Sequence, residues 1–277
     1  MRNLWSESST TVKLIIVNAI VFLIVRLSDI AAWGGTLRPG WILEWVAMPM
    51  NAGVVYRPWT IISSFFTHYD IVHFFCNAFT LYWFGRLFEE EFRSKGMLLK
   101  AYFLGGLAGN VFALAVTMLT GYSERVVMPI LLGASGAIVC LLVAVAVATP
   151  RRQVWMAFVG NIELRWIAIV TLLIFVVLTI GMQNFGGNLA HIGGAIMGYF
   201  TAKYWRKIDQ IPLPQIGKRK VRMRATPGYN KDWEYNKRKV DDEKELNRIL
   251  DKIREKGYNS LTDTEKRTLF DISGNNK

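Results

Sequence analysis

The sequence predicts an all-α membrane protein, with a bundle of six transmembrane helices followed by a small helical tail on the cytoplasmic side. Three observations support this fold. Hydrophobic residues make up 52% of the 277 residues, and the mean hydropathy is positive, at +0.25. The chain contains six apolar stretches close to the ~20 residues that cross a bilayer. Basic residues gather at alternate turns and in the tail, which is the asymmetry that orients membrane proteins.

The six apolar stretches lie within residues 12–206, which we expect to form one membrane domain after a short cytoplasmic N-terminus, residues 1–11. The predicted spans are residues 13–33, 68–88, 97–120, 128–148, 166–183 and 187–205. A long connection rich in tryptophan, including Trp41, Trp45 and Trp59, joins the first two spans. Tryptophan favours the headgroup region, so we expect this connection to lie at the membrane interface.

The tail after the last span divides into a basic linker, residues 207–240, and a small helical pair, residues 241–277. Leu246, Ile249, Leu250 and Ile253 share one helical face, and Gly257 is a typical helix stop. Thr262 and Glu265 have the spacing of a capping box at the start of a second helix. So small a pair needs outside support to fold. We expect it to dock on the membrane face, on a second copy or on another protein.

The net charge of +12 is concentrated in this tail. From Lys203 onward the chain has 20 Lys and Arg against 12 Asp and Glu, which gives the tail +8. Seven of the other basic residues flank the turns after the second and fourth spans: Arg86, Arg93, Lys95, Lys100, Arg151, Arg152 and Arg165. The turn after the third span carries only Arg125, and the turn after the fifth span carries no basic residue. The positive-inside rule therefore places both termini in the cytoplasm. Basicity beside a membrane argues against a nucleic-acid-binding role.

Cysteine usage and the N-terminus exclude other classes. Cys76 and Cys140 both lie in apolar stretches and indicate neither a disulfide framework nor a zinc site, so we expect no metal and no cofactor. The N-terminus lacks the short apolar region and small-residue cleavage site of a signal peptide. The first apolar stretch is therefore interpreted as a retained span.

Ser135 is the first candidate for chemistry, because it lies between Gly133 and Gly136 near the start of the fourth span. In the predicted helix it is about seven residues from the start, ~10 Å below the surface. His191 lies near the start of the sixth span. Even-numbered spans run in one direction, so the hydroxyl and the imidazole can meet as nucleophile and base. No carboxylate is placed to orient His191, which favours a Ser–His dyad over a triad. The structural alternative is that Ser135 and its glycines only serve helix packing.

His73 and Asn77 are one helical turn apart near the start of the second span, on the same face of the membrane as Ser135. Both can direct donors at a developing oxyanion, with the Ser135 backbone N–H as a third donor. His68, the remaining histidine, lies on this face too. The alternative for Asn77 is a polar contact that holds the second span to its neighbours.

Taken together, these motifs resemble those of the rhomboid intramembrane serine proteases. The matching features are Gly133-Ala134-Ser135-Gly136, Ala190-His191-Ile192-Gly193-Gly194, and the His68, His73 and Asn77 set, over roughly residues 12–206. The resemblance implies a six-span core with Ser135 as nucleophile and His191 as base. It also implies oxyanion stabilisation by His73 and Asn77, a gating fifth span, and cleavage of other proteins' transmembrane segments. Gly194 and Gly198 form a small-xxx-small pair that would pack the sixth span on the fourth.

Two alternatives remain beside the protease. One is a non-catalytic relative that binds membrane proteins without cutting them; such proteins lose the serine or the histidine, and this chain keeps both. The other is a small transporter, for which the sequence offers neither inverted repeats nor a ladder of buried charges. We expect an integral protein of the bacterial inner membrane, with its active site opening to the outer face and with the lipid bilayer and transmembrane proteins as partners.

Overall fold

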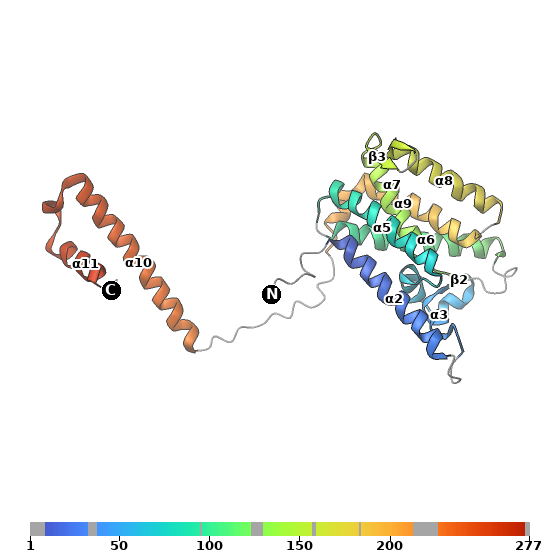
Figure 1. Cartoon of the computed structure of the whole chain (residues 1–277), viewed down its shortest axis with the longest axis horizontal. Coiled ribbons are helices and arrows are strands. Elements are labelled where there is room, and N and C mark those ends of the chain that lie inside the picture. The colour runs from blue at the N-terminus through green and yellow to red at the C-terminus, as the bar shows by residue number, and fades with distance from the viewer. Residues whose placement is uncertain are drawn as a thin grey trace. The chain divides into compact units, whose positions relative to one another are not determined.

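The computed structural model describes residues 9–32, 38–94, 96–122, 130–156, 159–182, 184–212 and 227–274. The chain forms two compact units, residues Met1–Pro214 and Gln215–Lys277, each with its own internal contacts. Both units are built mainly of helices (Figure 1). The N-terminal residues 1–8, Trp33 and residues 213–226 of the predicted linker lie outside the described residues.

Six long helices make up most of the first unit, within the described ranges, and each lies on one of the predicted apolar stretches. They are α2 (Thr10–Ala32), α5 (Ile71–Glu91), α6 (Met97–Leu119), α7 (Ser135–Ala148), α8 (Leu164–Ile180) and α9 (Phe185–Asp209). Of the helices described, α2 and α6 are both long enough and apolar enough to cross a membrane, while α7 and α8 are shorter apolar helices. Asp70 caps the start of α5, because its carboxylate accepts a hydrogen bond from the His73 backbone N–H at 2.8 Å.

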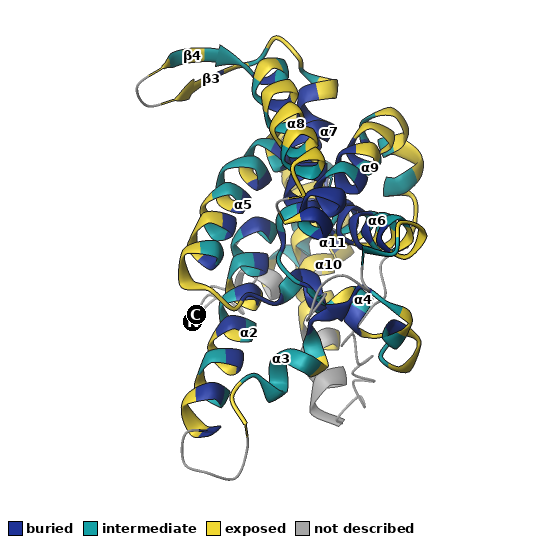
Figure 2. Cartoon of the chain, turned by 90° about the vertical axis from the view of Figure 1, so that its right-hand side faces the viewer, coloured by how far each residue is buried: buried dark blue, intermediate teal, exposed yellow. Residues whose placement is uncertain are grey.

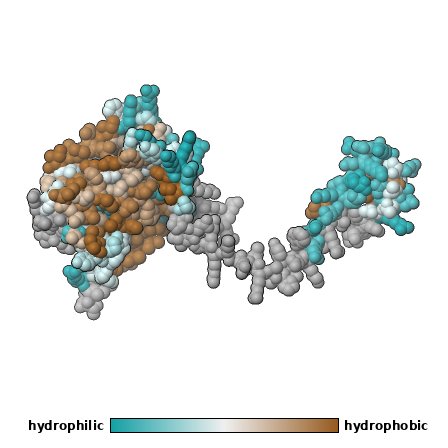
Figure 3. Space-filling model, turned by 180° about the vertical axis from the view of Figure 1, so that it is seen from behind, coloured by the Kyte–Doolittle hydropathy of each residue, from teal (hydrophilic) through white to brown (hydrophobic). Residues whose placement is uncertain are grey.

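Helix α7 occupies the centre of the first unit, and every residue from Gly136 to Ala146 in it is buried. It packs between α6 and α9, while α5 and α8 cover its other sides. Figure 2 shows α7 in dark blue at the centre and α8 with an exposed outer face. Figure 3 shows that much of the surface of this unit is hydrophobic. A bundle with a buried central helix and apolar side chains exposed on its outer surface is typical of a protein that is surrounded by lipid.

The connection between α2 and α5 is folded against the bundle. It contains α3 (Trp41–Val46), β1 (Met48–Pro49), η1 (Ala52–Tyr56), α4 (Thr60–Ser63) and η2 (Ser64–Phe66). The rings of Trp45 and Trp59 stack with centroids 5.9 Å apart, and both side chains are exposed. Met48 and Met50 are buried against Phe185 at the start of α9. The connection thus joins the helix ends while presenting Trp45 and Trp59 outward.

Two short strand pairs interrupt the helical pattern. Strand β1 pairs antiparallel with β2 (Ile130–Leu131), with Met48 opposite Leu131. A hairpin of β3 (Gln153–Met156) and β4 (Gly160–Glu163) joins α7 to α8, where the sequence analysis expected only a turn. Arg152 at the base of this hairpin forms an ion pair with Glu90 of α5 at 2.5 Å.

The second unit contains α10 (Pro227–Lys256), η4 (Tyr258–Ser260) and α11 (Asp263–Gly274). Helix α10 begins well inside the segment predicted as linker, so the boundary at residue 240 was wrong. Gly257 follows the helix with φ +79°, as a stop residue should. The capping box also forms: the Thr262 N–H donates to Glu265 at 2.9 Å, and the Glu265 N–H donates to Thr262 Oγ1 at 3.3 Å.

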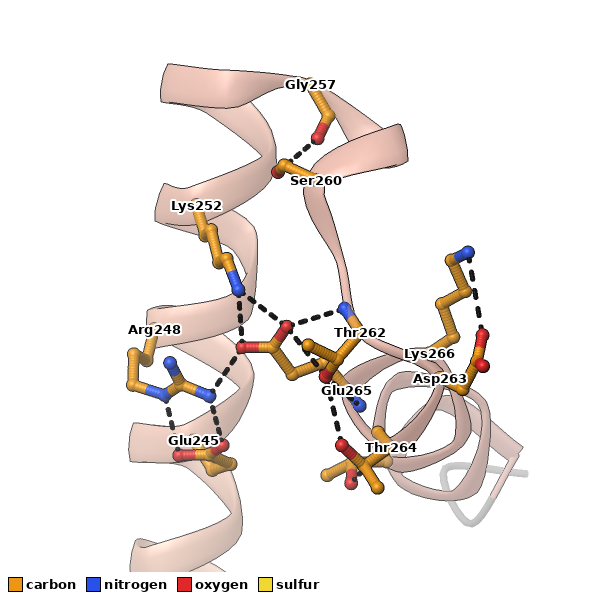
Figure 4. A network of polar contacts seen from close by, with 11 residues as sticks. Glu245, Arg248, Lys252, Gly257, Ser260, Thr262, Asp263, Thr264, Glu265 and Lys266 are labelled. Carbon is orange, nitrogen blue, oxygen red and sulfur yellow. Dashed lines mark hydrogen bonds and ion pairs between the residues drawn. The ribbon is translucent and has the colours of Figure 1, made fainter.

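Glu265 also joins the two helices of this unit. Its carboxylate accepts hydrogen bonds from Lys252 at 2.7 Å and from Arg248 at 3.0 Å, both on α10 (Figure 4). The Lys252 ammonium, together with the Thr262 N–H, lowers the pKa of Glu265 to about 2. Ile249 and Leu261 are buried beside this network. A charged hydrogen-bond cluster therefore supplements a very small apolar core.

Candidate active site

Ser135 is the first residue of α7, whereas the sequence predicted about seven helical residues before it. The chain reaches it through β2 and the non-helical residues Leu132–Ala134, so no helical turn precedes the serine. Gly133 adopts φ +113°, a conformation that other residues rarely take, and its N–H donates to the Ser64 carbonyl at 2.9 Å. Because a helix leaves its first N–H groups without intrahelical acceptors, the backbone of Ser135 and Gly136 presents free donors beside the hydroxyl.

His191 lies on α9, and its Nε2 is 2.6 Å from the Ser135 Oγ. Close approach of α7 and α9 produces this distance. A Cβ built on Gly194 would lie 2.1 Å from the Gly136 carbonyl oxygen, and one on Gly198 would lie 2.6 Å from the Cys140 carbonyl oxygen. The two glycines of α9 therefore let its backbone rest directly on that of α7.

The other ring nitrogen of His191, Nδ1, is buried and has no hydrogen-bond partner among the described residues. Instead, the imidazole lies against the ring of Phe175 from α8, with centroids 4.0 Å apart and the planes inclined by 38°. For Nε2 to accept the proton of the Ser135 hydroxyl, the neutral imidazole must carry its own proton on Nδ1. The described residues thus contain a Ser–His pair without a third, orienting carboxylate.

His73 and Asn77 of α5 face the segment before Ser135. A Cβ on Gly133 would lie 2.9 Å from His73 Nε2 and 3.8 Å from Asn77 Nδ2, so both side chains approach this glycine. Asn77 Nδ2 donates one hydrogen bond to the His73 carbonyl at 3.1 Å, which leaves its second N–H for another acceptor. His68 supports the segment from the other side, because its Nε2 accepts a hydrogen bond from the Ala134 N–H at 3.4 Å.

A cavity of about 610 Å³ connects these side chains. Its lining includes Ser135, His191, His73, Asn77 and Gly133, and its remaining walls come from η2, β2 and the helices α5, α6, α7, α8 and α9. Apolar residues make up most of the walls. This is the character of a pocket that binds an apolar chain and orients one polar bond in it.

Two contributors to the site were missed by sequence reasoning. Phe175 covers the imidazole, as described above. Asn110 of α6 donates to Ser64 Oγ at 2.7 Å and to the Ile61 carbonyl at 2.8 Å, which fixes the turn whose carbonyl holds Gly133. An isolated Asn in an apolar stretch was the available signal for Asn110. No signal pointed to Phe175, because α8 is apolar throughout.

The helical bundle with its largely apolar surface, and the Ser135–His191 contact at an apolar cavity, define a class of membrane proteins that carry a serine–histidine pair. Residues 56–208 match the Rhomboid domain, which is more than half of the chain. The chain therefore belongs to the rhomboid family, a family of intramembrane proteases, and is an integral membrane protein.

Two further similarities were found. The chain is 32% identical over 159 residues to RHOMBOID-like protein 12, mitochondrial, from Arabidopsis thaliana. That alignment covers 54% of this chain and 46% of the relative, so the chain spans about half the length of that protein. Residues 229–275 match a family of unknown function (DUF6576), which coincides with α10 and α11 of the second unit.

Proposed function

We propose that the protein is an intramembrane serine endopeptidase that cleaves transmembrane segments of other proteins with a Ser135–His191 dyad. The observation that carries this proposal is the 2.6 Å separation of Ser135 Oγ and His191 Nε2 at the wall of an apolar cavity. Membership of the rhomboid family supports the same reaction class. No metal or cofactor takes part in the proposed chemistry.

In the first half of the reaction His191 Nε2 takes the proton of Ser135 Oγ while the oxygen attacks the scissile carbonyl carbon. The tetrahedral intermediate collapses, the bond to nitrogen breaks, and His191 returns the proton to the leaving amine. Water then attacks the acyl–serine ester with His191 again as base. The released carboxyl product carries the water oxygen, and Ser135 regains its proton.

Negative charge develops on the carbonyl oxygen in both halves. Three donors are assigned to it: the Ser135 backbone N–H, the His73 imidazole and the free N–H of the Asn77 amide. Their approach to Gly133 supports this role, as does the position of Ser135 at the positive end of α7. The strained Gly133 keeps that space open, because any larger residue would displace the His73 ring.

The six long helices of the first unit are assigned as six membrane spans. Their match to six apolar stretches supports this count, with α7 and α8 shortened by the strands that flank them. The basic residues at the turns support cytoplasmic termini and an active site on the outer face. We assign the protein to a bacterial inner membrane, while the relative named above is mitochondrial.

Transmembrane proteins are the proposed substrates, and the second unit is proposed to dock on the membrane face, on a second copy or on another protein. Its size supports the need for a docking surface, because α10, α11 and the connection between them bury only Ile249 and Leu261 among their described apolar side chains.

The proposal is tested by incubating the purified protein in detergent with a model substrate that contains one transmembrane segment. The wild type is expected to cut it, and Ser135→Ala and His191→Ala are expected to show no cleavage while keeping wild-type thermal stability. Binding of the substrate without cleavage by an intact wild type would favour the non-catalytic alternative. Cleavage that persists in Ser135→Ala would exclude the dyad.

A further inference from the structure

His191 is held by few polar contacts for a residue proposed as a general base. One nitrogen meets Ser135, and the other has no hydrogen-bond partner in the described part of the chain. A histidine with one hydrogen bond can rotate about its side-chain bonds unless packing prevents it. The ring of Phe175, 4.0 Å away between centroids, supplies an aromatic contact to the face of the imidazole.

Phe175 belongs to the helix that is least embedded in the bundle. Among the residues of α8, only Leu164 and Ala168 are buried, and both lie in its first half. In the second half, Leu172 and Phe175 are partly buried against an apolar cluster formed by Val139, Val143 and Ala195. Phe175 therefore contacts His191 from the second half of α8, whereas the buried residues of this helix lie in its first half.

We propose that Phe175 is a positioning residue that keeps the His191 imidazole aligned on Ser135, and that α8 must be packed on α9 when the proton is transferred. This inference rests on the proposed protease function. An aromatic side chain is required because a flat ring restricts the imidazole plane over its whole face, whereas an aliphatic side chain of similar volume touches it at a few atoms. Outward movement of α8 would remove this restriction.

The sequence neighbourhood of Ser135 offers no substitute for that ring. The residue one turn after the serine, on the same side of α7, is Val139, which packs in the cluster with Phe175 and contributes no aromatic face. The cavity lining contains Phe175 and His191 together, so the ring also borders the space where substrate would lie. Because the ring contacts the imidazole that takes the proton, its loss should alter the chemical step more than the affinity for substrate.

The test compares Phe175→Leu, Phe175→Tyr and the control Leu172→Ala with the wild type in full-length, detergent-solubilised protein. Leu172 packs on the same apolar cluster but has no ring to place against the imidazole. Two rates are measured: turnover of the transmembrane substrate, separated into kcat and KM, and labelling of Ser135 by a small fluorophosphonate. Labelling needs an activated serine without requiring a transmembrane segment to enter.

Phe175→Leu is expected to lower both kcat and the labelling rate roughly 10-fold or more, since small errors in the alignment of a catalytic group cost this much. KM should change less than about twofold. Phe175→Tyr keeps the ring and should retain both rates within about threefold, as should Leu172→Ala. Wild-type or faster labelling by a folded Phe175→Leu would overturn the positioning role, as would equal losses in Phe175→Tyr. Failure of the wild type to be labelled at all would instead refute the proposed function.

Discussion

Gly194→Ala adds a single methyl group at the closest approach of α7 and α9. The added Cβ would lie 2.1 Å from the Gly136 carbonyl oxygen and 2.9 Å from its carbonyl carbon. Both atoms belong to the backbone of α7, so no side chain can rotate away. Ordinary van der Waals contact begins near 3.4 Å, which requires the two helices to separate by about 1.3 Å at this point, the difference between 3.4 and 2.1 Å.

This separation acts directly on the proposed dyad, because Gly136 follows Ser135 and Gly194 lies one turn after His191. A hydroxyl–imidazole distance of 2.6 Å would lengthen beyond hydrogen-bond range if the helices moved apart by the full amount. Misplacement by about 1 Å costs on the order of 100-fold in rate. Overpacking of this kind also destabilises a fold by ~1–3 kcal/mol. We expect a folded protein with at most about one per cent of the wild-type turnover.

The matched control is Gly181→Ala at the end of α8. A Cβ there meets only the Val177 and Leu178 carbonyl oxygens at 3.6 and 3.7 Å, and the backbone has φ −73°. Substrate cleavage, fluorophosphonate labelling and thermal stability are measured for both variants in the same detergent. If Gly194→Ala cleaves at the rate of Gly181→Ala and melts at the same temperature, the close packing of the two backbones does not set the Ser–His distance.

Four other perturbations have defined outcomes. His73→Ala and Asn77→Ala each remove one oxyanion donor and should lower kcat 10- to 1000-fold with a smaller change in KM; wild-type kinetics in the double variant would refute their role. Gly133→Ala should lose turnover, because φ is +113° and the new Cβ would lie 2.8 Å from the His73 ring; normal kcat would argue that the loop is not strained. The depressed pKa of Glu265, about 2 instead of 4.5, means that its contribution to folding is complete above pH 4.5 and disappears as pH falls through 2. Hydrogen exchange in residues 227–274 of the wild type should hence accelerate near pH 2. In Glu265→Gln it should already be faster at pH 7, whereas the control Glu255→Gln, at an exposed position, should match the wild type at pH 7. Equal protection in both variants would contradict the network in Figure 4. Deletion of residues 215–277, which spares the Asp209–Lys100 contact at the end of α9, should leave Ser135 labelling unchanged; loss of labelling in a folded truncation would make the second unit part of the catalytic machinery.

The helices of the first unit were predictable because apolar stretches of this length have few other structures available. The start of α7 was not. The segment before α7, residues 128–134, is as apolar as the helix itself. Ile130 and Leu131 stay outside the helix because they pair with Pro49 and Met48. Such a contact joins segments about 80 residues apart, and a local pattern carries no information about it.

The proximity of Ser135 and His191 could be predicted from helix direction alone, since the starts of even-numbered spans share one membrane face. Contacts that depend on helix rotation did not follow. Helix α8 is apolar on every side, so its sequence does not indicate that Phe175 faces the bundle. The early start of α10 had a local signal, Pro227 at the first helical position, but the polar residues after it showed no apolar period to extend the helix.

The central claim, that Ser135 is a nucleophile activated by His191, is tested most directly by mapping the residue that a fluorophosphonate modifies in the full-length protein. The wild type is reacted in detergent, digested and analysed by mass spectrometry, beside His191→Ala and the packing control Leu172→Ala. We expect one modified peptide in the wild type, with the phosphonate on Ser135. The same peptide should form at full yield in Leu172→Ala and be absent in His191→Ala. Modification of a different residue, or labelling of Ser135 that is independent of His191, would contradict the claim.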